Sequence, residues 1–265
     1  MKKLRYNDYI IEGRRFMLSK LQIILDKPKD IHLNFNISSL LQGVIMEQIS
    51  YEFASELHNG NRQPYSQYVE FGQDRIIWNI QTLTQKAYEQ IIVPMLQENV
   101  QSIYLRHKDL ELSIRDKRLE QCSYDQLRKE RYFTDGSRVK TIRFLSPTAF
   151  KSQGEYIFYP SVHFLFQSLM MKYDACSDDA DLFGSEVMEH FEKNSKVVRY
   201  KLRSYSFQLE GTKIPSFLGE VTIKINGPQA LVNLADYLLA FGEYSGVGIK
   251  CGIGMGGVKI AKEGK

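Results

Sequence analysis

The chain has 265 residues, 43% of them hydrophobic and 25% charged, which suits one large or two ordinary domains with a substantial core. Its three cysteines, Cys122, Cys176 and Cys251, lie far apart and form no CxxC pair. This argues against a structural zinc site or a disulfide framework and favours a reducing cytoplasm. No apolar run is long enough for a membrane span and no signal-peptide pattern is found, so we expect no membrane partner.

The net charge of +4 is unevenly placed. Residues 106–143 carry eleven Lys/Arg against seven Asp/Glu, and residues 196–205 carry four basic residues and no acid. Such clusters suit a polyanion, although a solvated strand face explains them equally well.

Residues 1–16 are treated separately from the fold. They contain Ile-Glu-Gly-Arg at positions 11–14, a protease-cleavage sequence typical of engineered leaders, and Met17 follows as a natural start. We expect residues 1–16 to be a non-native N-terminal extension.

In the first half, alternation over residues 19–25 predicts a strand, and residues 36–60 predict one long helix. The apolar stripe of this helix repeats every four positions and consists of Leu41, Ile45, Ile49, Phe53 and Leu57. We expect strands at 67–71 and 75–80, a helix at 82–96 and at least one strand within 102–119. This is the β-α-β-β-α-β order of a ferredoxin-like domain.

The second half repeats the order of elements without repeating the sequence. Strands are expected at 139–150, 198–209, 217–225 and 255–260, and helices at 159–173, 185–193 and 227–246. The predicted fold class is α+β, with tandem ferredoxin-like (RRM-like) domains at 17–135 and 136–265 and a C-terminal glycine-rich loop.

That loop, residues 246–257, reads GVGIKCGIGMGG. Gly252, Gly254 and Gly257 satisfy GxGxxG, but a dinucleotide site needs a strand before the loop and a helix after it, and here a helix precedes it and little chain follows. The lysine-serine pair of a phosphate-binding P-loop is also missing. A nucleotide-using enzyme is therefore the least favoured hypothesis, behind a tight helix-to-strand crossing or a backbone surface for phosphates.

The pairs Gly246-x-Gly248 and Gly254-x-Gly256, five residues apart, resemble the C-terminal signature of CRISPR repeat-processing endoribonucleases (Cas6 family). Residues 34–45, 56–68 and 144–150 also resemble family landmarks, so the resemblance covers nearly all of the chain from Met17. It implies tandem ferredoxin-like domains that bind CRISPR precursor RNA and cut each repeat once, without metal or other cofactor. Residues 58–68 are most similar to relatives of type III-A systems, which implies transient contact with a type III effector complex by a monomer or homodimer.

Metal-free RNA cleavage needs a base for the 2′-hydroxyl proton, an acid for the leaving 5′-oxygen and cations for the transition state. Histidine suits the proton transfers, because its ordinary pKa lies near working pH. His58 ends the first predicted helix, where the helix dipole favours a cation, and it matches the position of the family's catalytic histidine. The reaction implied leaves a 2′,3′-cyclic phosphate and a 5′-hydroxyl. The other histidines are interpreted as loop, surface or core residues: His32, His107, His163 and His190.

The residues that would assist His58 depart from the family pattern. Relatives often carry a tyrosine at the position of Met46 and a lysine at that of Gln63. Tyr51, on the same predicted helical face as His58, and Arg62 are the candidates to replace them.

Arg199, Lys201, Arg203 and Tyr205 share one face of a predicted strand. Basic and aromatic side chains in this pattern can hold an RNA backbone and stack a base, while a charged sheet edge is the simpler alternative. Other RNA-binding candidates are Gly246, Gly248, Lys250, Gly254 and Gly256 of the loop, with Lys140 and Arg143 near the domain boundary. Two hypotheses stay open: an endoribonuclease, or a repeat-RNA-binding protein of the same fold that does not cut.

Overall fold

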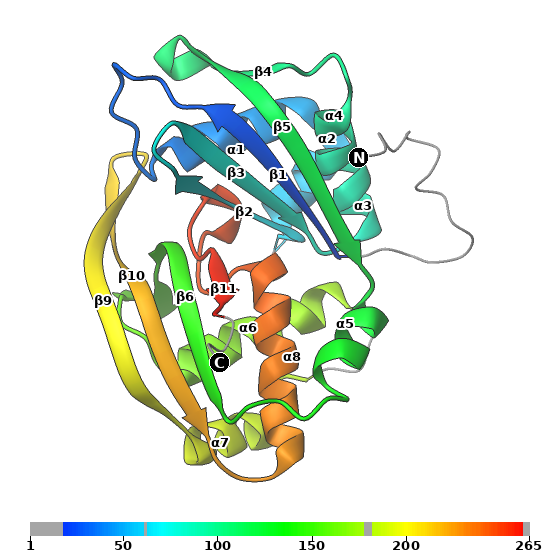
Figure 1. The fold of residues 1–265 in the computed structure, drawn as a ribbon, viewed down its shortest axis with the longest axis vertical. Coiled ribbons are helices and arrows are strands. Elements are labelled where there is room, and N and C mark those ends of the chain that lie inside the picture. The colour runs from blue at the N-terminus through cyan, green and yellow to red at the C-terminus, as the bar shows by residue number, and fades with distance from the viewer. Residues whose placement is uncertain (1–17, 61–62, 178–181, 262–265) are drawn as a thin grey trace.

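The computed structural model describes residues 18–60, 63–177 and 182–261 (Figure 1), so the expected extension 1–16 and Arg62 lie outside it. The first half contains β1 (Leu18–Asp26), α1 (Ile37–Gln48), α2 (Tyr51–Asn59), β2 (Tyr65–Phe71), β3 (Arg75–Thr82), α3 (Gln85–Ala87), the π turn η2 (Tyr88–Ile92), α4 (Val93–Leu96), β4 (Ser102–Leu105), the 3-10 turn η3 (Arg106–Lys108), β5 (Leu110–Cys122) and α5 (Tyr124–Arg131). The second half contains β6 (Val139–Thr148), β7 (Phe150–Ser152), β8 (Glu155–Ile157), α6 (Val162–Cys176), α7 (Ser185–Asn194), β9 (Ser195–Leu209), β10 (Thr212–Ile225), α8 (Gln229–Ser245), the 3-10 turn η4 (Cys251–Ile253) and β11 (Val258–Ile260).

The first half is an antiparallel sheet with helices on one face. Its strand order is β2-β3-β1-β5-β4, and β1 pairs along its length with both β3 and β5. Alternate residues of β1, namely Leu21, Ile23 and Leu25, enter the core beneath α1 and α2. Figure 1 shows these helices behind the sheet.

The helix predicted over 36–60 is broken into α1 and α2. Ile49 adopts an extended conformation, and the Ser50 hydroxyl accepts a hydrogen bond from the Phe53 amide at 3.2 Å, which caps a new helix. The four-residue stripe is nevertheless buried as predicted, because the two helices present it to the same core. The last turn of α2, with His58, lies next to residues of the second half.

The second half has the sheet order β11-β6-β10-β9, also antiparallel. Figure 1 shows β9, β10 and β6 in front of α6 and α7. Side chains at Phe217, Val221 and Ile223 point to the helices and form the second core with α6 and α8. Helix α5 was not predicted, and its Tyr124 and Leu127 pack into this second core.

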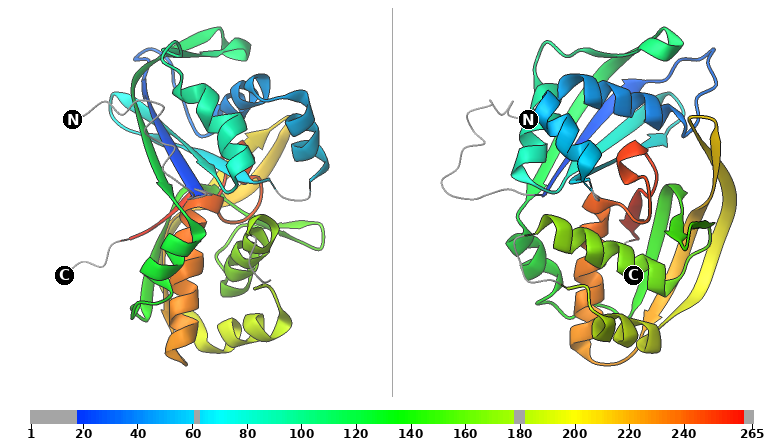
Figure 2. Two further views of the ribbon diagram at one scale, coloured as in Figure 1. Left: turned by 90° about the vertical axis from the view of Figure 1, so that its right-hand side faces the viewer. Right: turned by 180° about the vertical axis from the view of Figure 1, so that it is seen from behind.

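The halves meet through the glycine-rich loop, residues 246–257. The rear view in Figure 2 shows this segment between the helices of the first half and α6. Gln67, fully buried on β2, donates its amide to the carbonyls of Ser38 (2.8 Å) and Gly252 (3.2 Å) and accepts from Trp78 Nε1 at 2.7 Å. A third cluster of apolar residues, which includes Phe207 and Met255, fills the same junction.

Among the described residues, no helix has the length and apolar character needed to cross a membrane.

Candidate active site

His58 is exposed in the last turn of α2, next to two residues of the apolar stripe that fix the orientation of the helix. Phe53 and Leu57 are buried, so the helix face that carries His58 is turned away from the core. The helix ends at Gly60, whose amide donates to the Glu56 carbonyl at 2.8 Å. His58 is therefore a basic residue in the last turn of α2, at the negative end of the helix dipole.

His58 lines a cavity of about 660 Å³ between the two halves. The end of α2 and the start of β2 form one wall, while β7, α6 and the loop around η4 form the other. Three lysines line the second wall: Lys151, Lys172 and Lys250. No Asp or Glu is among the described residues that line the cavity. The electrostatic potential inside must therefore favour an anion.

Of the two predicted partners of His58, only Tyr51 is among the described residues, and it is not placed beside His58. Tyr51 is 84% exposed at the start of α2 and does not line the cavity. It precedes His58 by seven positions, or about 10 Å along the helix axis. Arg62 lies outside the described residues. Gln63 does line the cavity, with the buried Tyr65 beside it. Burial raises the pKa of Tyr65 to about 12, so this phenol remains protonated at neutral pH.

The expectation that loop glycines offer their amides to phosphates is corrected by the structure. The amides of Gly246, Gly248 and Gly256 donate to the Gly242 carbonyl, the Ser168 hydroxyl and the Pro147 carbonyl. The Gly254 amide is turned to the Cys251 carbonyl at 3.4 Å. These amides are therefore engaged within the protein.

The loop needs glycine because it packs against the first half. A Cβ on Gly254 would lie 2.0 Å from Ser38 Cβ, and φ there is +114°. A Cβ on Gly252 would lie 1.9 Å from Gln63 Oε1. Both separations are shorter than any van der Waals contact. At Gly254 the clash is with Cβ of a short side chain and φ is left-handed, so a larger residue there would strain the contact between the halves, whereas at Gly252 the end of the flexible Gln63 side chain can move aside.

Lys140 is also corrected as an RNA contact. The register pairs it with Ile223, so its side chain points to the helices, where its ammonium lies 2.7 Å from Asp236. Lys140 is 7% exposed and Asp236 is 5% exposed. The lysine therefore forms a buried ion pair and is not available to a ligand.

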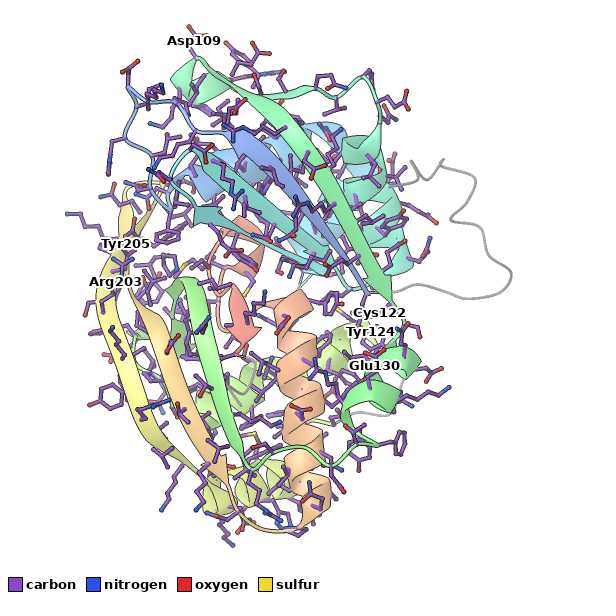
Figure 3. All side chains as sticks on the ribbon, in the orientation of Figure 1. Asp109, Cys122, Tyr124, Glu130, Arg203 and Tyr205 are labelled. Carbon is purple, nitrogen blue, oxygen red and sulfur yellow. The ribbon has the colours of Figure 1, made fainter. Side chains whose placement is uncertain are left out.

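The opposite face of the second sheet is strongly basic. Arg199, Lys201 and Arg203 are exposed on β9 as predicted, although Tyr205 packs its ring edge against Phe35 at 5.4 Å. Figure 3 labels Arg203 and Tyr205 on β9, near the first half.

Cross-strand register adds to this face residues that the sequence interpretation had not linked to it. Lys201, Glu220, Arg143 and Lys259 lie side by side on four neighbouring strands, and Lys224, four residues after Glu220 on β10, pairs with Lys196. Its exposed cations, hereafter the basic sheet face, are Arg143, Lys196, Arg199, Lys201, Arg203, Lys224 and Lys259. Glu220 accepts a hydrogen bond from Arg143 at 2.6 Å, which offsets one of these charges. The alternation of apolar and polar residues along β10 and β11 could have predicted from the sequence that Lys224 and Lys259 are exposed on this face.

Comparison with known proteins identifies relatives that match most of this chain. The family model for the CRISPR-associated endoribonuclease Cas6 matches residues 142–258. The Cas6 endoribonuclease of Streptococcus thermophilus is 31% identical over 82% of this chain and 88% of its own. That of Mycobacterium tuberculosis is 32% identical over 92% and 78%.

Solved structures agree in fold. A Cas6 product complex has a TM-score of 0.75 at 21% identity, covering 92% of this chain and all of the other. Thermus thermophilus Cas6 has a TM-score of 0.72 at 22% identity, covering 94% and 100%. With more than 30% identity to two relatives over 82% and 92% of its length, this chain belongs to the CRISPR-associated Cas6 endoribonuclease family.

Proposed function

We propose that this protein cleaves CRISPR precursor RNA within its repeats, by general acid-base catalysis without a metal ion. The observation that carries the proposal is His58 at the edge of a cavity lined by lysines and free of carboxylates among its described residues. An RNA phosphate has the charge that this cavity favours, and an imidazole is the side chain best suited to move the protons.

In the proposed reaction, His58 accepts the proton of the 2′-hydroxyl next to the scissile phosphate or returns one to the leaving 5′-oxygen. The 2′-oxygen bonds to phosphorus as the bond to the 5′-oxygen breaks. The products carry a 2′,3′-cyclic phosphate and a 5′-hydroxyl. Lysine ammonium groups offset the extra negative charge of the pentavalent transition state. A catalytic role for Arg62 stays a prediction, whereas the exposed position of Tyr51 argues against one.

The basic sheet face is the proposed surface for the rest of the RNA. Seven exposed cations spread over four strands suit several successive phosphates. An open sheet face backed by helices is a common platform for single-stranded RNA.

The proposed architecture is a pair of ferredoxin-like domains. In its support, the orders β2-β3-β1-β5 and β9-β10-β6-β11, the second read from its other edge, place the four strands of each half in the same 2-3-1-4 order once β4 and the β7–β8 hairpin are set aside. We propose domains near 17–135 and 136–265, with α5 packing onto the second one. Contact with a type III effector complex, a cytoplasmic location and a monomeric or dimeric state remain part of the proposal.

The test is incubation of 5′-labelled repeat RNA with the protein in EDTA, followed by mapping of the cut and its ends. We expect one cut per repeat, a cyclic phosphate upstream and a free 5′-hydroxyl downstream, with no cut when the 2′-hydroxyl at that site is replaced by hydrogen. His58→Ala should slow cleavage about 100-fold or more while leaving RNA affinity within about threefold. His190→Ala, an exposed histidine on α7, is the matched control and should cleave like the parent.

Two outcomes would contradict the proposal. Unchanged cleavage by His58→Ala would remove the imidazole from the mechanism. Tight repeat binding by the parent with no cut under any condition would favour the alternative, a binding protein that does not cleave.

A further inference from the structure

The three lysines of the cavity are not equivalent. Lys172 of α6 donates to the carbonyls of Ser245 (3.3 Å) and Gly246 (3.0 Å) and lies 2.9 Å from Cys251 Sγ. An ammonium group has three N–H donors, and all three are engaged here. Lys172 therefore fixes the end of α8 to the loop and contributes only its charge to the cavity.

Lys250 is held by the loop yet keeps its side chain exposed. Its backbone is left-handed, with φ of 56°, and its carbonyl accepts from the amides of Ile253 (3.0 Å) and Met255 (3.3 Å). The ammonium forms no ion pair with any described residue. A non-glycine residue in this conformation needs its surroundings to hold it, which gives the side chain a fixed origin on the cavity wall.

Lys151 enters the same wall from a different element. It lies on β7, in the β7–β8 hairpin, with its ammonium 5.8 Å from the centre of the Tyr156 ring. It too is exposed and forms no ion pair within the described part of the chain. Two lysines that form no ion pair with a described residue thus line a cavity whose opposite wall carries His58.

The first half does not supply a cation at the matching place among its described residues. Gln63, a neutral amide, lies against Gly252, two residues from Lys250. The loop packs on the first half so that the segment with Lys250 and Gly252 lies next to the end of the Gln63 side chain.

We propose that Lys250 and Lys151 are catalytic residues that contact the non-bridging oxygens of the scissile phosphate opposite His58. This inference rests on the proposed RNA cleavage and adds the two groups that carry the transition-state charge. The second half then contributes more than RNA affinity, because the phosphate-binding wall and the proton-transfer group belong to different halves.

The test is single-turnover cleavage of repeat RNA in EDTA by Lys250→Ala and Lys151→Ala, each beside its arginine counterpart. We expect each alanine variant to cleave about 100-fold more slowly, as when one donor of an oxyanion cradle is lost. Lys250→Arg and Lys151→Arg keep the charge and should recover most of the rate. Affinity for an uncleavable RNA, with a 2′-hydrogen at the cut, should change less than about fivefold, since only one of many phosphate contacts is lost.

Lys129→Ala, an exposed lysine on α5 away from both surfaces, is the control and should cleave like the parent. The inference is overturned if the alanine variants cleave at the parental rate, or if affinity falls as much as the rate does. Absence of cleavage by the parent would instead defeat the proposed function itself, so the two failures can be told apart.

Discussion

Replacement of Lys140 by methionine tests whether this residue stabilises the fold or binds RNA. Its ammonium lies 2.7 Å from Asp236 Oδ1, with both side chains more than nine-tenths buried. Methionine keeps the aliphatic bulk and removes the charge, which leaves the Asp236 carboxylate without its buried partner. Arg131, 3.9 Å from the other carboxylate oxygen and 45% exposed, is too distant and too solvated to replace it.

The expected loss is about 3–5 kcal/mol in the free energy of unfolding, the usual cost of removing one member of a buried ion pair. For a chain of this size that corresponds to a melting temperature lower by about 6–20 °C. The double variant Lys140→Met/Asp236→Leu removes both charges and should recover most of the loss, because two apolar groups can replace a buried pair at little net cost.

The assay is thermal unfolding followed by circular dichroism for the parent, both single variants and the double variant, with RNA affinity measured well below every transition. Lys140→Met should bind repeat RNA as the parent does, whereas Lys201→Ala should bind more weakly. A Lys140→Met protein of parental stability and reduced RNA affinity would refute the reasoning, since the lysine would then be an RNA contact.

Three other predictions follow from features described above. RNA affinity, measured by filter binding, should fall about 100-fold or more between 50 and 200 mM salt. Lys224→Ala should make the slope of log affinity against log salt concentration shallower by about 0.7–1, because one phosphate contact is lost. An unchanged slope would show that Lys224 does not contact the RNA. Gly257→Ala places a Cβ 2.4–2.8 Å from ring atoms of Tyr68 and should lower the free energy of unfolding in urea by about 1–3 kcal/mol. Gly43→Ala on α1, where a Cβ has nothing within 4 Å, should raise it by about 0.5–1 kcal/mol. Equal effects of the two substitutions would contradict the packing argument. Burial raises the pKa of Tyr65 to about 12 above its ordinary value of 10, so folding favours the protonated phenol: the stability it contributes is complete below pH 10 and lost between pH 10 and about 12. Denaturant unfolding at pH 9 to 12 should show this loss, Tyr65→Phe should remove part of it, and an identical pH profile for that variant would count against the assignment.

Local patterns predicted the elements well where one segment decides its own structure. The long strands β9 and β10 follow from alternation, and α8 from its apolar run behind a proline. Two elements were predicted wrongly, because the pattern of apolar residues does not show where a side chain caps a helix or where a short polar helix forms. Ser50 caps a new helix inside an unbroken stripe, and α5 is a charged segment whose two apolar residues, Tyr124 and Leu127, are too few to give a clear period.

The site was less predictable because it depends on register and on packing between halves. Alternation cannot say which face of β6 is covered, so Lys140 and Arg143 could not be separated until their partners, Ile223 and Glu220, were known. Likewise Lys151 and Lys250 stand about a hundred residues apart and meet His58 only after both halves have folded and docked. The position of His58 at the end of a helix was the part that local sequence could supply.

The loop's fit against the first half also bears on how such a gene can change over generations. Gly254 packs directly against Ser38, so this contact fits only while both residues stay small. A recombinant protein with one half from a distant relative would keep both hydrophobic cores intact, but its two halves would pack poorly against each other. We therefore expect the two halves to evolve together, with substitutions in the loop accompanied by compensating substitutions at the residues of the first half that it contacts.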